Sequence, residues 1–354
     1  ATAYEITDVV LWRNPLELEE VRAHARREDA PRAGELWFPV AGLQVGDSLI
    51  FKSGGCTADA LVWQGMPVRD AYPASTLLPP GTTEIDLTVQ TPAPAECRYS
   101  VNEKLGFDAM RPLDGRVAGL AANPNRADQV FVRCSNAPEF ALPLLYRSLP
   151  EANPSYPRKS KLWGSSNMLA HGLEFASKVD LYLGAEMSAS DIRALRERNP
   201  RMLVLTSINT VENHGLPEDY FLHDTQGNKI EVWPGTYRLN LTKPYVAEYQ
   251  AQWAYQKMLD SDLMYDGCFF DNFFTSQSWL KADIHGRAVQ LDADEDGQPD
   301  DPAWLDRAWR QGVFYELSIW RRLMPHALAT GHLPNPVTPE VGEIFNGNSI
   351  LFWS

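Results

Sequence analysis

The chain has 354 residues, 44% of them hydrophobic and 22% charged, a composition typical of a globular protein in water. This length exceeds one ordinary domain and predicts two or three. No apolar run approaches the roughly 20 residues that a membrane helix needs. The net charge of −14 disfavours nucleic acids and anionic membranes as partners. The composition leaves the oligomeric state unknown.

Residues 1–151 are predicted to form a β-rich sandwich region. Segments of alternating hydrophobicity at 35–42, 48–53, 84–90 and 129–134 are separated by clusters of Gly, Pro, Asn and Asp. The charged stretch 13–34 is expected to be an excursion from this region, with one surface helix. Residues 152–160 are rich in Pro and polar residues, and this composition predicts a linker.

From residue 161 onward, short apolar strands alternate with helical segments. This alternation predicts a parallel sheet and favours a (β/α) barrel of the TIM type over 161–354. About six strands are found rather than eight, and the chain stops inside the last one. We therefore expect a barrel that lacks its last two βα units. The predicted strands are 161–166, 179–184, 202–207, 268–272, 326–331 and 349–353.

Three helices are predicted between these strands. The first, at 188–199, has Ser190 as its expected N-cap, and the second, at 244–259, has Pro244 near its start. The third begins with Asp301 as N-cap and Pro302 at the first helical position. Its expected buried face consists of Leu305, Trp309, Val313, Leu317, Trp320 and Met324.

The segment YDGCFFDN at 265–272 is the most informative stretch for function. Its apolar run 268–270 is typical of a buried parallel strand, and Asp271 and Asn272 follow at the carboxyl end. In α/β barrels the loops that leave this end converge on the active site, so Asp271 is a catalytic candidate. The simpler alternative is that Asp271 caps the next turn. Asp266 precedes the strand and is predicted to be structural.

Several polar and aromatic residues are expected at the same mouth, where they could bind sugar hydroxyls or stack on sugar rings. Among the aromatic residues, Trp163 and Trp233 are favoured because each adjoins Gly or Pro; Tyr182, Phe273 and Trp279 are further candidates. Each polar residue has the alternative role of bracing a loop. The polar candidates are Asn209, Glu212, His214, Asn272, His332 and Asn348.

An acidic segment, DADEDGQPDD at 292–301, has the spacing of a calcium loop. Carboxylates recur at every second position, Gly297 permits a sharp turn, and a further Asp stands at the ninth position. The twelfth position is Ala303 rather than Glu, so Asp301 or Asp306 is expected to supply the missing ligand. The alternative is an acidic loop without metal. The predicted structural Ca²⁺ ligands are Asp292, Asp294, Asp296, Gln298 and Asp300.

The segment AECRYSVNEKLGFDAM at 95–110, followed by VFVRC at 130–134, resembles fibronectin type III-like modules of bacterial secreted proteins over roughly residues 75–150. The resemblance implies a disulfide between Cys97 and Cys134 and an exported, extracellular setting. Two buried thiols are the alternative. Cys56 and Cys268 are left over, and Cys268 is expected to be a small buried hydrophobe. The chain carries no initiator Met or signal peptide, so any export signal is expected to have been removed or to lie outside it.

The C-terminal region resembles a family of glycoside hydrolases with barrel catalytic domains. The matching elements are 198–209, FLHDTQGNKIEVWPG at 221–235, LNLTKPYVAEY at 239–249 and YDGCFFDN. The resemblance implies cleavage of a glycosidic bond in an oligo- or polysaccharide, with Asp271 as one catalytic carboxylate. A non-catalytic carbohydrate-binding protein that uses the same cleft is the alternative.

Glycosidic cleavage ordinarily requires two carboxyl groups, one acting as acid and one as nucleophile or base. Asp271 is assigned the second role. For the acid, Glu186 follows the strand at 179–184, and Glu343 is a weaker choice. An acid beyond residue 354 is the option that the strand count favours. The sequence leaves open the sugar, the linkage and the choice between retention and inversion.

Overall fold

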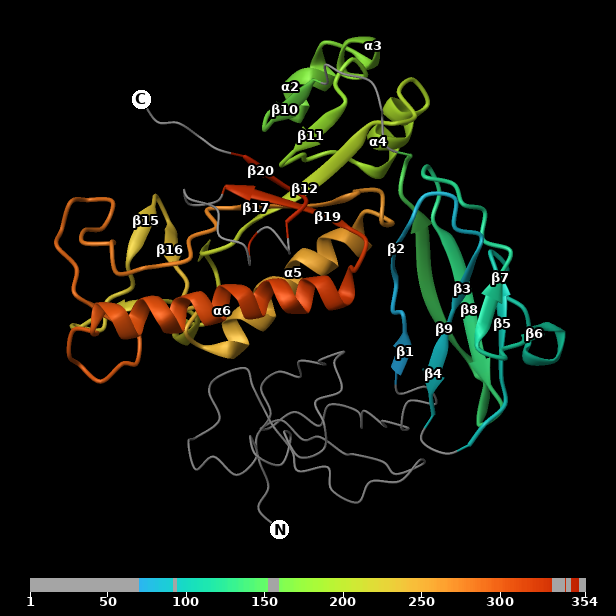
Figure 1. Ribbon diagram of the computed structural model, residues 1–354, viewed down its shortest axis with the longest axis horizontal. Helices are drawn as coiled ribbons and strands as arrows, with labels where there is room; N and C mark the ends of the chain where they lie inside the picture. The colour runs from blue at the N-terminus through green and yellow to red at the C-terminus, as the bar shows by residue number, and fades with distance from the viewer. Residues whose placement is uncertain (1–69, 92–93, 152–158, 333–340, 342–344, 350–354) are drawn as a thin grey trace, which may run out of the picture. The chain divides into compact units, whose positions relative to one another are not determined.

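The computed structural model describes residues 70–91, 94–151, 159–332, 341 and 345–349, shown in colour in Figure 1. They divide into two compact units. The first comprises Glu84–Ala118, Val130–Leu144 and the described residues up to Ala74; the second comprises Ser75–Thr83, Gly119–Gln129 and the described residues from Leu145 onward. The segments predicted at 13–34, 35–42 and 48–53, together with Cys56 and most of the expected linker, lie outside the described residues.

The first unit is built from antiparallel β pairs. Strand β5 pairs with β6 and β8, β1 pairs with β4, and β3 pairs with β7. Its elements are β1 (Asp70–Tyr72), β3 (Glu84–Asp86), β4 (Thr88–Gln90), β5 (Cys97–Val101), η1 (Phe107–Ala109), β6 (Arg111–Pro112), β7 (Arg116–Ala118), β8 (Asp128–Cys134) from Val130 onward and the first part of β9 (Ala137–Ser148). The β-rich character predicted here is therefore found in the described residues, while the fibronectin-like module stays a prediction.

Cys97 and Cys134 lie directly opposite each other on β5 and β8, and a disulfide joins them. The pairing implied by the fibronectin resemblance is thus confirmed. The register places the two Cα atoms 4.0 Å apart, so the bond links neighbouring strands that are already hydrogen-bonded.

The second unit contains a six-stranded parallel sheet in which each strand lies beside its predecessor (Figure 1). This order follows when each strand returns to the same sheet through a crossover, and it produces the parallel half-barrel seen in the described residues. All six predicted strands are found, the last of them beginning at Gly347 rather than Ser349. The strands are β10 (Ser160–Leu162), β11 (Leu181–Leu183), β12 (Leu203–Asn209), β17 (Gly267–Asp271), β19 (Leu328–His332) and β20 (Gly347–Ser349).

The helices of this unit whose bounds lie within the described residues are α2 (Ser165–Ala170), α3 (Leu173–Ala176), α4 (Ala189–Arg196), α5 (Pro244–Asp260) and α6 (Pro302–Leu323). The N-cap of α4 is Ser188, not Ser190, because the Ser188 hydroxyl accepts a hydrogen bond from the backbone N–H of Asp191 and completes a capping box. Asp301 caps α6 as predicted. No helix in the described ranges is both long and apolar enough to cross a membrane.

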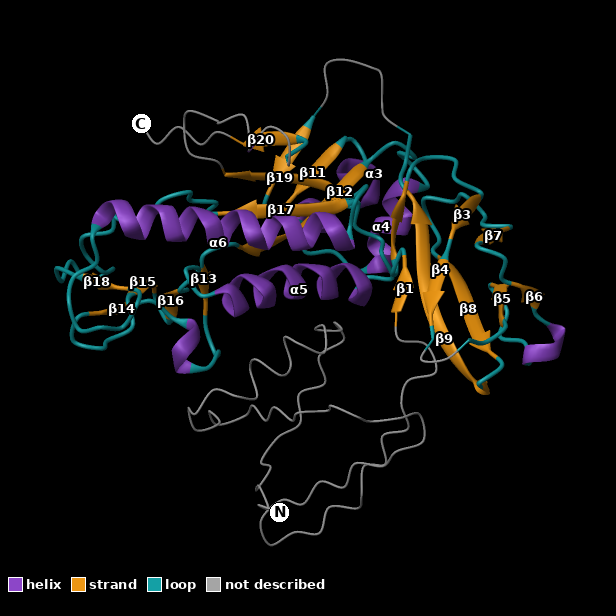
Figure 2. Ribbon diagram, turned by 60° about the horizontal axis from the view of Figure 1, so that its bottom comes forward, coloured by secondary structure: helices purple, strands orange, loops and turns teal. Residues whose placement is uncertain are grey.

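Helices α5 and α6 lie side by side along one face of the sheet (Figure 2). The predicted apolar face of α6 is buried there, and Gly312 brings α6 so close to the backbone of Leu241 that a Cβ atom would lie 1.7 Å from its carbonyl oxygen. Phe270 of β17 faces these helices and contacts Trp320 of α6. Since side chains alternate along a strand, Phe269 and Asp271 project from the opposite face.

A long insertion separates β12 from α5 and carries short strands of its own. Strands β13, β16 and β15 form an antiparallel sheet, and β14 pairs with β18 from the segment after β17. The elements are β13 (Glu212–Asn213), η2 (Glu218–Tyr220), β14 (His223–Asp224), β15 (Glu231–Trp233), β16 (Thr236–Arg238) and β18 (Leu291–Asp292); β2 (Thr76–Leu78) pairs separately with the end of β9.

Cys268 has no exposed surface and is a free thiol on the helix side of β17. Burial raises the pKa of this thiol to about 12, so it remains protonated and unreactive at neutral pH. The interpretation of Cys268 as a small buried hydrophobe is therefore confirmed.

A fully buried cluster of charges lies at the amino-terminal edge of the sheet. Asp266 accepts hydrogen bonds from Arg147 Nη2 at 2.8 Å and from Arg196 Nη2 at 2.5 Å, and all three side chains have no exposed surface. The same carboxylate accepts the backbone N–H of Val204 at 2.8 Å. Asp266 is thus a structural residue, as the sequence predicted from its place before β17.

We expect Asp266→Asn to destabilise the second unit strongly, because it leaves two buried guanidinium groups without a compensating charge. Breaking one partner of a buried ion pair costs about 3–5 kcal/mol. The control is Asp262→Asn, since Asp262 is 63% exposed and forms a surface pair with Arg193. Such surface pairs contribute at most about 1 kcal/mol. Chemical denaturation should separate the two variants, and equal stabilities would contradict a supporting role for the cluster.

The disulfide gives a second prediction. It closes a loop with a sequence separation of 37 residues, and the chain-entropy relation assigns a loop of this size about 3–4 kcal/mol. Reducing agent should therefore lower the melting temperature of the parent protein and leave that of the Cys97→Ser/Cys134→Ser double variant unchanged. Recovery of both cysteines as free thiols in non-reducing peptide mapping would contradict the bond.

Candidate active site

The carboxyl ends of three neighbouring strands bring polar side chains together. Asn209 ends β12, Asp271 ends β17, and the register of the two strands places these residues directly opposite each other. His332 ends β19, and its Nδ1 lies 2.6 Å from Asp271 Oδ1. Asn209, Asp271 and His332 were all predicted to lie at this mouth, and the structure brings them into one cluster.

Two nitrogen atoms lie close to one oxygen of Asp271. Besides the contact with His332 Nδ1, the backbone N–H of Asn272 donates to Oδ1 at 3.0 Å. Asn272 was predicted to contact sugar or to brace Asp271, and in the structure its backbone supplies the bracing bond. This is possible because Asn272 adopts a left-handed conformation with φ of 54°, which Asn tolerates better than most residues. The Asp271 side chain remains 22% exposed.

A second carboxyl group, that of Glu212, interacts with Asp271 through its charge. Glu212 of β13 is 4% exposed, its Oε2 accepts a hydrogen bond from Asn209 Nδ2 at 2.9 Å, and its Oε1 lies 3.1 Å from Arg238 Nη1. The ion pair is a cross-strand pair, because Glu212 lies directly opposite Arg238 in the β13–β16 register. Asn209 therefore connects the two carboxyl groups, since it lies beside Asp271 and donates to Glu212.

The environment of Glu212 raises the pKa of its carboxyl group. Burial is the largest cause, and the charge of Asp271 adds to it, while Arg238 and the Asn209 amide act in the opposite direction. Burial also lowers the pKa of Arg238 to about 10, which still leaves its guanidinium charged at neutral pH. The site thus contains two carboxyl groups in unlike environments, one partly exposed and one buried.

Glu186, the predicted acid, lies elsewhere at the same edge. It follows β11, is exposed to solvent, and its backbone exchanges hydrogen bonds with the Ser165 hydroxyl. Burial raises the pKa of the Tyr265 hydroxyl, and the charge of Glu186 adds to this effect. The carboxyl group that interacts with Asp271 is Glu212 rather than Glu186. Glu343 lies outside the described residues.

The predicted stacking residues differ in accessibility. Trp163 is 38% exposed, Trp233 on β15 is 61% exposed and Trp279 is 48% exposed, so each presents part of a ring to solvent. Tyr182 was wrongly predicted, because its side chain is 1% exposed and its hydroxyl donates to the carbonyl of Ala176 at 2.9 Å. Phe273 is fully buried as well. Both rings belong to the core and are closed to a ligand.

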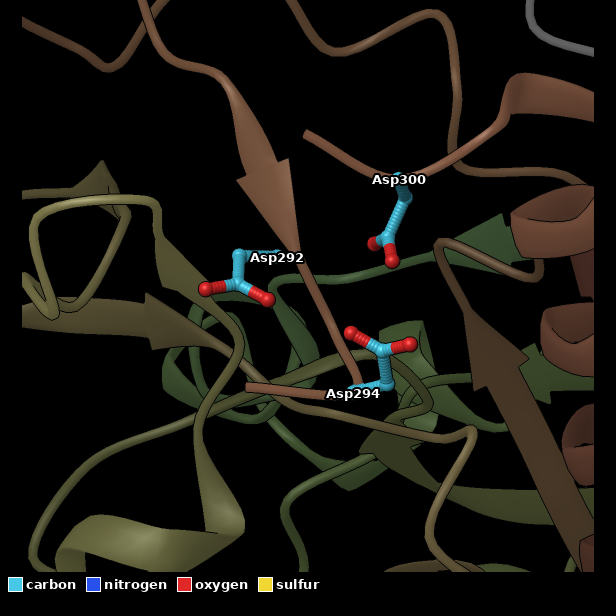
Figure 3. Close-up of side chains that lie close together, drawn as sticks. All are labelled: Asp292, Asp294 and Asp300. Atoms are coloured by element: carbon cyan, nitrogen blue, oxygen red, sulfur yellow. The ribbon is translucent and has the colours of Figure 1, made fainter. Parts of the chain in front are cut away.

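The acidic loop after β18 gathers three of its five predicted ligands. Asp292, Asp294 and Asp300 each offer a carboxylate oxygen, and these oxygens lie within 4.8 Å of one another. Figure 3 shows the three side chains directed toward a common space. Hard carboxylate oxygens at such spacing are the donor set that Ca²⁺ prefers, so the residues present fit this ion.

The backbone of the same loop folds around Asp292. Its two oxygens accept the backbone N–H groups of Asp296 and Gly297, each at 3.0 Å, and Gly297 provides the predicted sharp turn with φ of 81°. Asp296 does not join the group of three carboxylates and instead accepts the N–H of Gln298.

The two residues named for the missing twelfth ligand are engaged elsewhere. Asp301 caps α6, and Asp306 accepts three hydrogen bonds from Gln277 and Ser278. Both interactions hold the chain around the start of α6.

One family model matches the part of the chain that contains this site. Residues 197–297 match the model of a family described as hypothetical glycosyl hydrolase family 15. The matched segment contains Glu212 and Asp271. The resemblance to glycoside hydrolases is thereby confirmed, and the match supports glycoside hydrolase activity. Comparison with curated proteins gave no match.

Solved structures similar to this chain include several glycoside hydrolases. The glycoside hydrolase domain of PelA from Pseudomonas aeruginosa is 13% identical, with a TM-score of 0.36 over 55% of this chain and 67% of that chain. TtGalA, an α-galactosidase from Thermus thermophilus in complex with stachyose, is 12% identical, with a TM-score of 0.34 over 64% of this chain and 56% of that chain. Ega3 from Aspergillus fumigatus in complex with galactosamine is 15% identical, with a TM-score of 0.33 over 56% of this chain and 70% of that chain.

Proposed function

We propose that this protein hydrolyses glycosidic bonds of an oligo- or polysaccharide, with Asp271 and Glu212 as its two catalytic carboxyl groups. The observation that carries the proposal lies at the carboxyl edge of the parallel sheet, where Asn209 is opposite Asp271 in the strand register and donates to Glu212, and where the charge of Asp271 acts on Glu212. The family match over 197–297 supports the same class of reaction.

Asp271 takes the role of nucleophile or base. It is the more exposed of the two carboxyl groups, and its position is fixed by the end of a buried strand, by His332 and by the Asn272 backbone. Such fixed positioning lowers the entropic cost of reaching the transition state. Glycosidases need one such carboxylate on the sugar carbon or on the attacking water.

Glu212 takes the role of general acid. A buried carboxyl group with a raised pKa stays protonated to higher pH than an ordinary one, and this suits donation of a proton to the leaving oxygen. The different environments of Glu212 and Asp271 suit the two roles that a two-carboxylate mechanism requires, one group acting as acid and the other as nucleophile or base. Asn209 orients Glu212 through its amide.

We expect Asp271→Asn to lower the rate of glycoside cleavage by about 10³-fold or more while sugar binding stays within a few-fold, since only the reacting group changes. Release of reducing ends from a panel of polysaccharides measures the first effect, and affinity electrophoresis measures the second. Glu186→Gln is the matched control, because Glu186 is an exposed carboxylate at the same edge, and it should keep near-normal activity. Near-normal turnover by Asp271→Asn would remove this residue from the mechanism.

Glu212→Gln tests the proposed acid. Parent activity should fall as the pH rises through the raised pKa of Glu212, because the acid then loses its proton, and this alkaline limb should vanish in the variant. Cleavage of substrates with poor leaving groups should fall about 10²–10⁴-fold, the usual contribution of general acid catalysis. Aryl glycosides with good leaving groups should lose much less, since they do not need the proton. An equal loss on both substrate types would assign Glu212 a structural role instead. Binding of sugar without cleavage by the parent protein would favour the alternative of a carbohydrate-binding protein.

We further propose that the loop at 292–300 holds a structural Ca²⁺ ion through Asp292, Asp294 and Asp300. The loop adjoins the starts of both long helices, because Asp301 caps α6 and Glu295 contacts Lys243, the N-cap of α5, at 2.5 Å. Bound Ca²⁺ would screen the mutual repulsion of the carboxylates and fix these helix ends.

Chelation should lower the melting temperature of the parent protein, and Asp294→Ala should abolish this sensitivity. Binding stabilises the fold by about 2.7 kcal/mol when free Ca²⁺ is 100 times its dissociation constant. Asp296→Ala is the matched control, because Asp296 lies in the same loop outside the group of three carboxylates. If titration calorimetry detects no heat when Ca²⁺ is added, and a chelator leaves the melting temperature unchanged, the loop is an acidic loop that binds no metal.

A further inference from the structure

Helix α5 carries a buried glutamine among the apolar side chains that it packs into the core. Gln250 has no exposed surface. The other buried residues of this helix are all apolar: Val246, Ala247, Ala251, Ala254 and Met258. A polar side chain in such a place costs free energy unless its hydrogen bonds are made. The partners of Gln250 therefore show what it does.

One edge of β12 extends past the end of its neighbour β11 and needs hydrogen-bond donors from elsewhere. Beyond β11, the N–H of Ala185 still donates to the carbonyl of Leu205 at 2.8 Å. The N–H of Met187, two residues further on, donates to the Tyr265 hydroxyl at 3.1 Å instead of to β12. Carbonyl groups on this edge of β12 after Leu205 are thus without a donor from β11, and buried carbonyl groups require one.

Two side chains of α5 supply these donors. Gln250 Nε2 donates to the carbonyl of Asn209 at 2.7 Å and to that of Thr210 at 3.1 Å. Lys257 lies about two helical turns further along α5, and its Nζ donates to the carbonyl of Ser207 at 2.7 Å. Helix α5 therefore takes the place of a neighbouring strand along the carboxyl-terminal part of β12.

The oxygen of the same glutamine amide binds β13. Gln250 Oε1 accepts a hydrogen bond from Asn213 Nδ2 at 3.3 Å. Asn213 is itself 8% exposed, and its Oδ1 accepts the backbone N–H of His214 at 2.8 Å. The amide of Gln250 uses both its donor atom and its acceptor atom, and it bridges the two ends of the segment 209–213.

The segment 209–213 carries groups on which the proposed mechanism depends. It contains Glu212, the proposed acid, and Asn209, whose side-chain amide donates to Glu212. The backbone N–H of Thr210 also donates to the carbonyl of Asp271 at 2.9 Å, so the segment is tied to the end of β17. A shift of this segment would change the position of Glu212 relative to Asp271.

We propose that Gln250 is a positioning residue for the proposed acid, because it fixes the segment 209–213 from below and so holds Glu212 in place relative to Asp271. The proposal rests on the proposed glycoside hydrolase function and adds a residue to it. In the described part of the chain, the hydrogen bonds of Gln250 go to backbone carbonyls and to Asn213 rather than to either carboxyl group. Its effect therefore passes through the backbone of the segment.

Loss of the amide has a defined consequence for Glu212. Two buried carbonyl groups lose their donor, and they regain hydrogen bonds when the segment opens to water. The charged groups that act on Glu212 are Arg238 of β16 and Asp271 of β17, and burial is the largest cause of its raised pKa. More water around Glu212 lowers this pKa, so the acid loses its proton at a lower pH.

Gln250→Met tests the proposal, because methionine is a flexible side chain that fills space without an amide. On substrates with poor leaving groups, kcat should fall about 10- to 100-fold with KM nearly unchanged, since a 1 Å misplacement costs up to about 10²-fold. The alkaline limb of the activity should move to lower pH. Lys257→Met is the matched control, because it removes the other bond from α5 to β12, outside the segment 209–213. It should keep the kcat and the pH profile of the parent.

A second measurement follows Glu212 without any need for hydrolysis. Carbon NMR of protein labelled at the glutamate carboxyl groups gives the titration midpoint of Glu212, which is assigned with Glu212→Gln. This midpoint should fall in Gln250→Met and stay unchanged in Lys257→Met. If the parent cleaves no glycoside and the midpoint still falls in this way, the positioning role is upheld and the proposed hydrolysis is overturned.

Two results would overturn the positioning role and leave the proposed hydrolysis standing. One is an active parent whose kcat, pH profile and Glu212 midpoint are all unchanged in Gln250→Met. The other is an equal change in Gln250→Met and Lys257→Met, which would reduce both residues to general support of β12. In an inactive parent, an unchanged midpoint in Gln250→Met would overturn both proposals.

Asn213→Ala serves if Gln250→Met does not fold. It removes the bond from β13 to Gln250 Oε1, while both bonds from Gln250 to the carbonyls of β12 can remain. The alkaline limb and the Glu212 midpoint should move in the same direction by a smaller amount. A limb and a midpoint that both stay at the parent values would overturn the positioning role.

Discussion

The second unit depends on a carboxylate that has no contact with water. Asp266 lies just before β17, and its two oxygens bind Arg147 from the end of β9, Arg196 from α4 and the backbone of β12. Arg147 and Arg196 also both donate to the carbonyl of Pro124. One buried carboxylate therefore joins the start of β17 to the end of β9, to α4 and to β12. Because an unpaired charge in this position would be far more costly than the pair, the arrangement of these segments is tightly specified.

This cluster fixes the amino-terminal end of β17 and thereby the position of its carboxyl end. From Asp266 the strand runs through residues that are wholly buried, and it ends at Asp271, the first partly exposed side chain. Structural charges therefore lie at one edge of the sheet and the candidate catalytic charges at the other. All strands of a parallel sheet end at the same edge. Residues that stabilise the fold and residues that act in catalysis can therefore lie at opposite edges.

The insertion between β12 and α5 contributes residues to the candidate active site that the parallel sheet itself does not supply. It supplies Glu212 and Arg238 as a cross-strand pair, and Arg238 in turn contacts Phe274 and Trp279 from the loop after β17. The same insertion pairs through β14 with β18, which leads into the acidic loop. The candidate carboxyl groups and the candidate calcium loop therefore belong to one connected substructure. A change in the insertion would affect both.

Local sequence determined the secondary-structure elements of this protein and the residues at the ends of its strands. The strand–helix alternation gave the six strands and their order, and the apolar faces of α5 and α6, Pro302 and the Asp301 cap depend on residues only a few positions apart. Asp271, Asn209 and His332 could be placed at the mouth because each ends a strand, and strand ends converge by geometry. The fold of the acidic loop around Gly297 is equally local. Tyr182 was misplaced because its neighbours in β11 are both leucines, and such an apolar run does not reveal which face of the strand a side chain takes. Ser188 rather than Ser190 caps α4 because the capping box selects between two serines of equal local propensity.

Only the tertiary structure decided which of these residues interact and how buried each is. These properties depend on contacts between residues far apart in the chain. Glu212 was visible in the sequence as a polar residue near the mouth, but its burial and its raised pKa follow from Arg238, Asn209 and Asp271 together. Asp301 caps α6 and Asp306 binds the loop at 276–279, so neither joins the three carboxylates of the candidate metal site. Both interactions depend on the packing of α6 against this part of the chain. The sequence by itself therefore determined the elements and the strand-end residues, whereas long-range packing decided which of them interact and in what environment.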